Sequence, residues 1–194
     1  QGSFNGYERD RLFVPTDGAA PDRPWIDAGW LMGLDDDHDG RAVVPIDADG
    51  DGDQDLALWT LGGLVYRENT APAAAWTRVR LLEEDGTPAL GARITVTHAG
   101  RRLARRVALV EGFQSQVSTD VHVGLGGSPA ERIEAIEVRW KDGSLQRVEA
   151  VEAQRLVTIR RGQALNVFVC NDDKKCHHYN YYIVVHKMPP NNSF

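Results

Sequence analysis

An alternating run of aspartates is the part of this chain whose residue types most clearly suggest chemistry. From position 47 to position 55 every second residue is acidic: Asp47, Asp49, Asp51, Asp53 and Asp55. Carboxylates about 5 Å apart repel one another by roughly 1 to 3 kcal/mol per pair, depending on the effective dielectric. Because a compact loop of this composition resists folding without a counter-ion, the run predicts a cation site.

The alternation of oxygen donors suits Ca²⁺, a hard ion that takes six to eight oxygen ligands in a flexible shell. We expect carboxylate oxygens from Asp47, Asp49, Asp51 and Asp55 and a backbone carbonyl from Asp53. Gly50 and Gly52, which flank Asp51, permit the tight backbone that such a shell requires. The competing interpretation is a solvated acidic turn that holds no ion.

The flanks of the run distinguish it from an EF-hand loop, which it matches only in its first half. An EF-hand needs a bidentate Glu at its twelfth position, and here that residue is Leu58. The segments on either side, 42–46 and 56–60, are short apolar runs that read as extended strands. We therefore expect a loop between two strands, better suited to holding a shape than to sensing calcium.

A second acidic cluster, Asp35–Asp39, lies just upstream. It could complete the calcium shell, supply a second ion, or form a solvated loop, which is the usual role of a charge run. Asp39 is the residue of this cluster that we expect to be a ligand.

The bulk properties limit the class of protein. The 194 residues are enough for one large or two small domains, and the formal net charge of −6 argues against binding to nucleic acid. No run of 18 apolar residues is present, so we expect no membrane span. The chain begins at Gln1, as a processed or an engineered N-terminus would.

The two cysteines, Cys170 and Cys176, are close enough in sequence to form a disulfide. Closing a loop of this length would stabilise the fold by about 2.4 kcal/mol in the chain-entropy model. The alternative is a metal site that also uses His177 and His178, but this spacing is unusual for zinc. A disulfide and a calcium loop together indicate an extracellular or other oxidising compartment.

Extended segments with period-two alternation dominate the rest of the chain, and they predict an all-β protein containing an antiparallel β-sandwich. The predicted strands cover 76–82, 92–98, 121–125, 133–140, 145–148, 155–159, 166–170 and 178–186. Residues 141–144 predict a hairpin turn, residues 128–134 could form one short helical turn, and residues 71–75 read as a linker.

The stretch from Trp76 to about Gly162 resembles the ASPIC/UnbV domain. The resemblance rests on Leu90–Val96, Val123–Gly126 and Ile136–Trp140. The family usually has Phe where this chain has Val123, and Pro where it has Lys141. The N-terminal part, with Asp39-Gly40-Arg41 and the aspartate run, looks like a final FG-GAP/VCBS-type repeat.

The resemblance implies two parts: a calcium-binding repeat over 1–70 and a β-sandwich over 71–165. The remaining residues, 166–194, read as a disulfide-stapled C-terminal strand tail. The resemblance also implies an extracellular calcium-binding β-protein, and it implies no established catalytic activity. A single repeat is unusual, because blades of this kind need neighbours to bury their faces.

Catalytic and anion-binding motifs find little support in the sequence. Ser115 and Ser118 near Asp120 and His122 could be imagined as a triad, but neither serine lies in a nucleophile elbow. The basic segment 101–106 reads as the polar face of a hairpin rather than an anion site, although it could pair with the acidic half of a neighbouring molecule. We therefore expect no enzyme.

Two functional classes remain, and we favour the first. One is an extracellular, calcium-stabilised structural protein that assembles head to tail with other copies of itself through terminal β-strands. The other is a monomeric calcium-dependent adhesion module that binds matrix or glycans. Asn191-Asn192-Ser193 is in addition a formal N-glycosylation sequon.

Overall fold

The computed structural model describes residues 9–16, 24–72, 74–110, 115–127, 132–163, 166–170 and 176–180. All regular secondary structure in these ranges is β, which confirms the predicted fold class. None of the described residues forms a helix long and apolar enough to cross a membrane. The chain divides into two compact units. The first comprises Gln1–Ile46, Asp55–Glu68 and Gly112–Ser115, and the second comprises Asp47–Gln54, Asn69–Glu111 and Gln116–Phe194.

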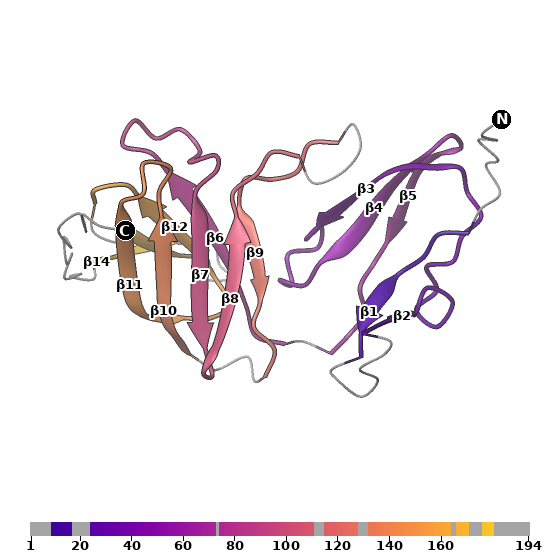
Figure 1. Cartoon of the computed structure of the whole chain (residues 1–194), viewed down its shortest axis with the longest axis horizontal. Helices are drawn as coiled ribbons and strands as arrows, with labels where there is room; N and C mark the ends of the chain where they lie inside the picture. Colours follow the sequence, from indigo (N-terminus) through magenta and orange to yellow (C-terminus); the bar gives the residue numbers. More distant parts are fainter. Residues whose placement is uncertain are drawn as a thin grey trace, which may run out of the picture. The chain divides into compact units, whose positions relative to one another are not determined.

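The first unit contains two small sheets (Figure 1). Its five strands are β1 (Phe13–Pro15), β2 (Trp25–Asp27), β3 (Gly40–Ile46), β4 (Asp55–Thr60) and β5 (Gly63–Arg67). Strands β1 and β2 pair antiparallel, and β3, β4 and β5 form an antiparallel meander in that order. The predicted extended segments on either side of the aspartate run are thus paired strands.

The meander exposes much of its apolar surface. Trp59 on β4 lies directly across from Leu64 on β5, and these side chains are 57% and 65% exposed. A two- or three-stranded sheet buries little surface by itself, so it is only marginally stable without cover on one face. The expectation that a single repeat cannot bury its own faces agrees with this exposure.

The second unit is a sandwich of two sheets, drawn face to face in Figure 1. One sheet has the order β11-β10-β7-β8 and the other has the order β14-β13-β12-β6-β9. The strands are β6 (Trp76–Leu82), β7 (Arg93–His98), β8 (Arg101–Arg106), β9 (Val121–Gly124), β10 (Arg132–Arg139), β11 (Leu145–Glu152), β12 (Leu156–Arg160), β13 (Asn166–Cys170) and β14 (Cys176–Asn180). Among the pairings of these strands, only β6 with β12 is parallel.

The hydrophobic core of this unit lies between its two sheets. Successive side chains of a strand point to opposite faces, so every second residue faces the core. The inward residues from the first sheet include Ile94, Val96, Ile136, Val138 and Val148, and those from the second include Val79, Leu81, Val123, Val157 and Ile159. All ten are no more than 1% exposed. The sequence alternation that predicted strands therefore also predicted which face is buried.

Most predicted strands of this unit appear within one or two residues of their expected limits. The hairpin turn at 141–144 is also confirmed, with the backbone N–H of Trp140 donating to the carbonyl of Ser144 at 2.9 Å. The predicted helical turn is wrong where it can be seen, because residues 132–134 begin β10; its first part lies outside the described residues. The tail strand is described only as far as Asn180, and Asn191 lies outside the described residues.

Candidate metal centre

The loop between β3 and β4, residues 47–54, is held in a tight curve by its own aspartates. The carboxylate of Asp49 accepts the backbone N–H of Asp51 at 3.2 Å, and that of Asp51 accepts the N–H of Asp53 at 3.0 Å. These are local side-chain-to-backbone turns, for which Asp is well suited. The glycines complete the curve, since Gly50 and Gly52 adopt φ values of 83° and 93°.

This curve brings three carboxylates together. One oxygen from each of Asp47, Asp49 and Asp51 lies within 4.8 Å of the other two. Ca²⁺ binds its oxygen ligands at about 2.3 to 2.6 Å, so oxygens around one ion lie up to about 5 Å apart. The spacing of the three oxygens and their hard, anionic character therefore fit Ca²⁺. Water and backbone carbonyls would have to supply the rest of the shell.

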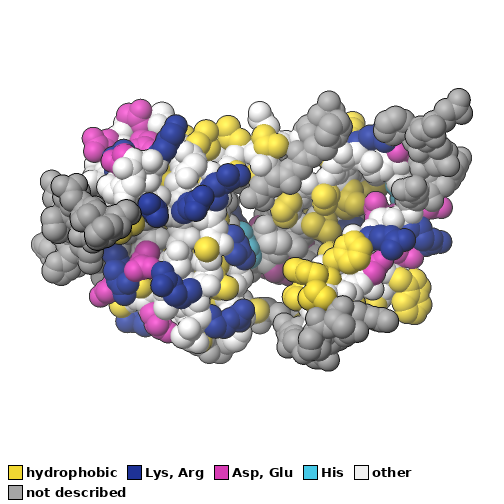
Figure 2. Space-filling view, viewed as in Figure 1, with side chains coloured by type: hydrophobic (Ala, Val, Ile, Leu, Met, Phe, Trp, Pro, Cys, Tyr) yellow, Lys and Arg dark blue, Asp and Glu magenta, His cyan; other side chains and the backbone are white. Residues whose placement is uncertain are grey.

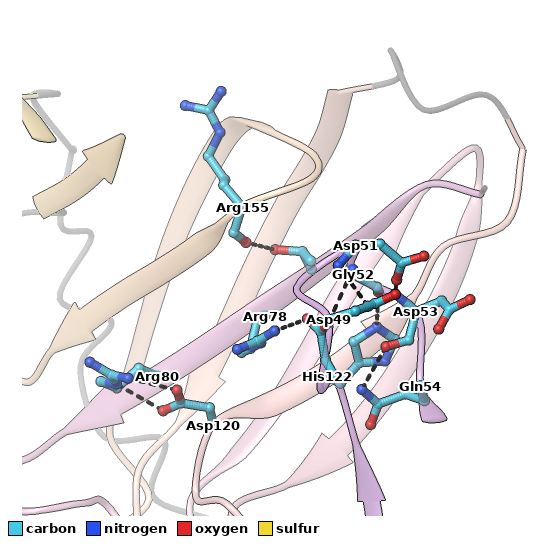
Figure 3. Close-up of polar contacts among 12 residues, drawn as sticks. Asp49, Asp51, Gly52, Asp53, Gln54, Arg78, Arg80, Asp120, His122 and Arg155 are labelled. Carbon is cyan, nitrogen blue, oxygen red and sulfur yellow. Dashed lines mark hydrogen bonds and ion pairs between the residues drawn. The ribbon is translucent and has the colours of Figure 1, made fainter. Parts of the chain in front are cut away.

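Arg78 on β6 pairs with the carboxylate of Asp47 (Figure 3). The Asp47 side chain is only 4% exposed, whereas Asp49 and Asp51 are exposed. A buried carboxylate is costly unless it is paired and hydrogen-bonded, and Asp47 also accepts the N–H of Gly52 at 3.4 Å. The guanidinium thus offsets the charge of the most buried carboxylate and leaves the other two open to solvent.

Gly52 fits closely against aromatic side chains of the same unit. A β-carbon at this position would lie 1.8 Å from the indole of Trp76 on β6. On the adjacent strand β9, His122 places Nε2 2.9 Å from the carbonyl of Gly52, and its ring stacks on Trp76 with centroids 6.2 Å apart. The middle of the acidic loop is therefore fixed by side chains from β6 and β9. Figure 3 shows the contact of His122 with Gly52.

The other expected ligands are placed differently. The backbone carbonyl of Asp53 accepts the side-chain amide of Gln54 at 3.1 Å. Asp55 is buried at the start of β4 and accepts the hydroxyl of Tyr66 at 2.8 Å. Asp39 pairs with Arg41 at 2.7 Å. These three aspartates are not part of the carboxylate group formed by Asp47, Asp49 and Asp51, and their role as ligands stays a prediction.

The second acidic cluster is largely matched by arginines of the first unit. Asp35 pairs with Arg9 at 2.7 Å, and Asp36 pairs with Arg67. Among the described residues of this cluster, Asp37 alone has neither an ion pair nor a side-chain hydrogen bond. A solvated, arginine-paired loop explains these charges without a second ion.

Three of the four residues considered as a triad serve other contacts, and the buried hydroxyl of the fourth, Ser115, has no hydrogen-bond partner among the described residues. Asp120 pairs with Arg80 through two hydrogen bonds of 2.8 and 2.7 Å, and His122 faces Gly52. The hydroxyl of Ser118 accepts the backbone N–H of Asp120 at 3.1 Å. These contacts orient the three side chains toward structural partners and give no nucleophile–base pair.

Most of the sandwich matches a known protein-family model. Residues 82–166 match the family model of ASPIC and UnbV. The match runs from the end of β6 to the start of β13 and contains the three motifs on which the sequence resemblance rests. The ASPIC/UnbV match covers rather less than half of the chain and does not reach the aspartate run, so an FG-GAP/VCBS-type repeat stays a prediction. No curated protein matches the chain.

Sequence reasoning found the aspartates but missed the residues of the ASPIC/UnbV-like sandwich that hold them. Trp76, Arg78 and His122 were recognised only as strand residues. Their period-two positions put them on one face of paired strands, because Arg78 lies directly across from His122. The alternating positions of these residues were the only signal in the sequence. They did not indicate that the aspartate loop lies against this face.

Gly52→Ala is expected to destabilise the second unit by about 2 to 5 kcal/mol. Left-handed backbone costs a residue with a β-carbon roughly 1 to 2 kcal/mol, and overpacking against Trp76 adds about 1 to 3 kcal/mol. Gly50→Ala is the matched control, because Gly50 has a similar φ but no atom within 4 Å of an added β-carbon. Urea unfolding measures both, and equal losses would contradict the close packing on Trp76.

The stability of the protein is expected to fall as pH drops below the ordinary histidine value of about 6.5. Burial lowers the pKa of His122, the hydrogen bond to Gly52 opposes this shift, and Arg78 adds to it. The unfolded chain then binds a proton at a higher pH than the folded chain does. The stability is fully present above the unfolded-state pKa and is lost between it and the lower folded-state pKa.

The measurement is the free energy of unfolding between pH 7.5 and pH 5.5 in EDTA. His122→Gln is the control, because its amide can still donate to the carbonyl of Gly52 but does not titrate. We expect the wild-type protein to lose more stability across this range than the variant does. Identical slopes would rule out a contribution from His122.

Proposed function

We propose that Asp47, Asp49 and Asp51 bind one Ca²⁺ ion and that the ion stabilises the loop between β3 and β4. The observation that supports this most directly is the grouping of their oxygens within 4.8 Å. Only one of the three carboxylates is paired with a cation, which leaves a residual negative charge in a small volume. A divalent ion would remove the repulsion that this charge creates.

The role that we propose for this ion is structural and not catalytic. The carboxylates lie on a loop whose centre is fixed by Trp76 and His122, and a fixed loop suits a permanent ion better than a signalling one. The polar residues near it are engaged in ion pairs and backbone hydrogen bonds. They offer no arrangement of nucleophile and base.

We further propose that the protein works outside the cell. The backbone register places Cys170 directly across from Cys176 on β13 and β14. Cα atoms of directly paired antiparallel residues are about 4.5 to 5.5 Å apart, and a disulfide needs about 4.4 to 6.8 Å. The register thus supports the proposed disulfide, and structural disulfides belong to oxidising compartments.

For the state of assembly we propose a monomeric, calcium-stabilised binding module. Strand β14 pairs with β13 of its own chain along its length, so these residues take part in their own sheet. Head-to-tail assembly is the second candidate. It is favoured by the position of β14 as the last strand of its sheet, because an edge strand can pair with another chain.

Calcium should raise the stability of the protein. For dissociation constants of about 10⁻⁴ to 10⁻³ M, typical of extracellular sites, 10 mM Ca²⁺ stabilises the folded state by roughly 1.4 to 2.7 kcal/mol. Asp49→Asn should remove most of this gain because it removes an anionic ligand. Asp37→Asn is the matched control, because it also removes one exposed carboxylate but leaves Asp47, Asp49 and Asp51 intact. This variant should retain the stabilisation by Ca²⁺.

Thermal unfolding in Ca²⁺ and in EDTA measures this effect, with Mg²⁺ as a second control ion. A melting temperature that does not respond to Ca²⁺, or an equal response in Asp49→Asn and the wild type, would refute the site.

The full-length protein is expected to sediment as one chain in the presence of Ca²⁺. A series of larger species that grows with concentration would favour head-to-tail assembly instead. In that case a truncation before Asn171 would show whether β14 forms the contact, since it removes this strand while leaving β13. Sedimentation velocity under non-reducing conditions distinguishes these results.

A further inference from the structure

Three arginines form a row across neighbouring strands of the sandwich. Arg93 on β7 lies directly across from Arg106 on β8 and also directly across from Arg139 on β10. Adjacent strands are about 4.8 Å apart, and directly paired residues point to the same face. All three side chains are exposed. The sheet therefore carries three guanidinium groups side by side.

The row lies on the face of the sheet that points away from the core. Ile94 and Val138, the sequence neighbours of Arg93 and Arg139, are fully buried on the opposite face. Figure 2 is viewed onto this unit, and dark-blue Lys and Arg side chains lie across it. The row is thus accessible to a large ligand.

Among the residues that the structure describes, other arginines on this face form ion pairs with carboxylates, whereas the three arginines of the row do not. Glu137 lies between Arg102 and Arg147 and bonds both, at 3.0 and 2.6 Å, and Glu149 bonds Arg147 at 2.8 Å. Within the described part of the chain, no carboxylate forms an ion pair with a side chain of the row.

This arrangement is unfavourable for the sheet itself. Like charges directly opposite each other on paired strands destabilise a sheet, and here one arginine has such a neighbour on both sides. The chain as a whole is acidic, with a net charge of −6, so the row is not a by-product of general basicity. A ligand that brings several anionic groups would remove the repulsion.

We propose that this row binds a linear sulfated polysaccharide. The guanidinium group offers a planar fork of donors that matches oxyanions, and three forks in line suit an extended chain with repeated anionic groups. The face belongs to a four-stranded sheet, which is wider than the single helix or two-stranded ribbon that a DNA major groove admits. Single-stranded nucleic acids bind aromatic side chains on which their bases stack. The paired residues on this face of the sheet, such as Thr95, Ala104 and Leu145, include no aromatic side chain.

The test uses heparin as the probe and the full chain as the protein. At about 0.15 M ionic strength, the wild-type protein should bind immobilised heparin. The triple variant R93Q/R106Q/R139Q should bind at least about tenfold more weakly, because three charge-assisted contacts are lost. Binding should persist in EDTA, which separates this inference from the proposed calcium site.

The control variant R9Q/R11Q/R41Q changes the net charge by the same amount. Its arginines are exposed and paired with carboxylates in the first unit, at 2.7, 3.6 and 2.7 Å. We expect less than about a twofold loss, because the charges of these guanidinium groups are already matched by carboxylates. The proposal would be overturned if the two triple variants lost heparin affinity equally. It would also be overturned if the wild-type protein did not bind immobilised heparin.

Two competitors test the class of ligand. Polyglutamate represents acidic peptides, and a DNA oligonucleotide represents nucleic acids. Either one competing as well as heparin would overturn the assignment to a sulfated polysaccharide. The melting temperature of R93Q/R106Q/R139Q gives an independent check. It should be equal to or above that of the wild type, since repulsion is removed, and a clear fall would show that the arginines stabilise the sheet.

Discussion

Repulsion among the carboxylates of Asp47, Asp49 and Asp51 is the constraint that the contacts around the aspartate loop must offset. Backbone N–H groups of the loop itself donate hydrogen bonds to these carboxylates, and Arg78 pairs with the most buried of them, that of Asp47. The fit of Gly52 against Trp76 then fixes the backbone directly after Asp51, the third of these aspartates. The loop and the side chains that hold it all belong to the second unit.

The sequence predicted the strands of the sandwich well because alternation records which face of a strand is buried. The aspartates were equally visible, because the residues that converge are almost consecutive. The contacts of Trp76 and His122 with the loop were not predictable, since they join segments far apart in the chain. The arginine row was hidden for the same reason. Arg93, Arg106 and Arg139 are neighbours only once the register of three strands is known.

The two units are stabilised in different ways. The second has a continuous apolar core between two sheets, which supplies the main favourable term in folding. The first has small sheets with exposed apolar side chains, such as Trp59 and Leu64, and several exposed ion pairs. Pairs of that kind each contribute about 0 to 1 kcal/mol.

The parallel pairing of β6 with β12 has a consequence for how the chain acquires its fold during synthesis. The hydroxyl of Thr77 on β6 donates to the backbone carbonyl of Arg155, 78 positions later and directly before β12. Contacts this distant in sequence make folding slow, because a long loop must close before they form. The central pair of this sheet can assemble only after β12 has left the ribosome. Until then β6 can pair only with β9 in this sheet, so one of its two edges stays open.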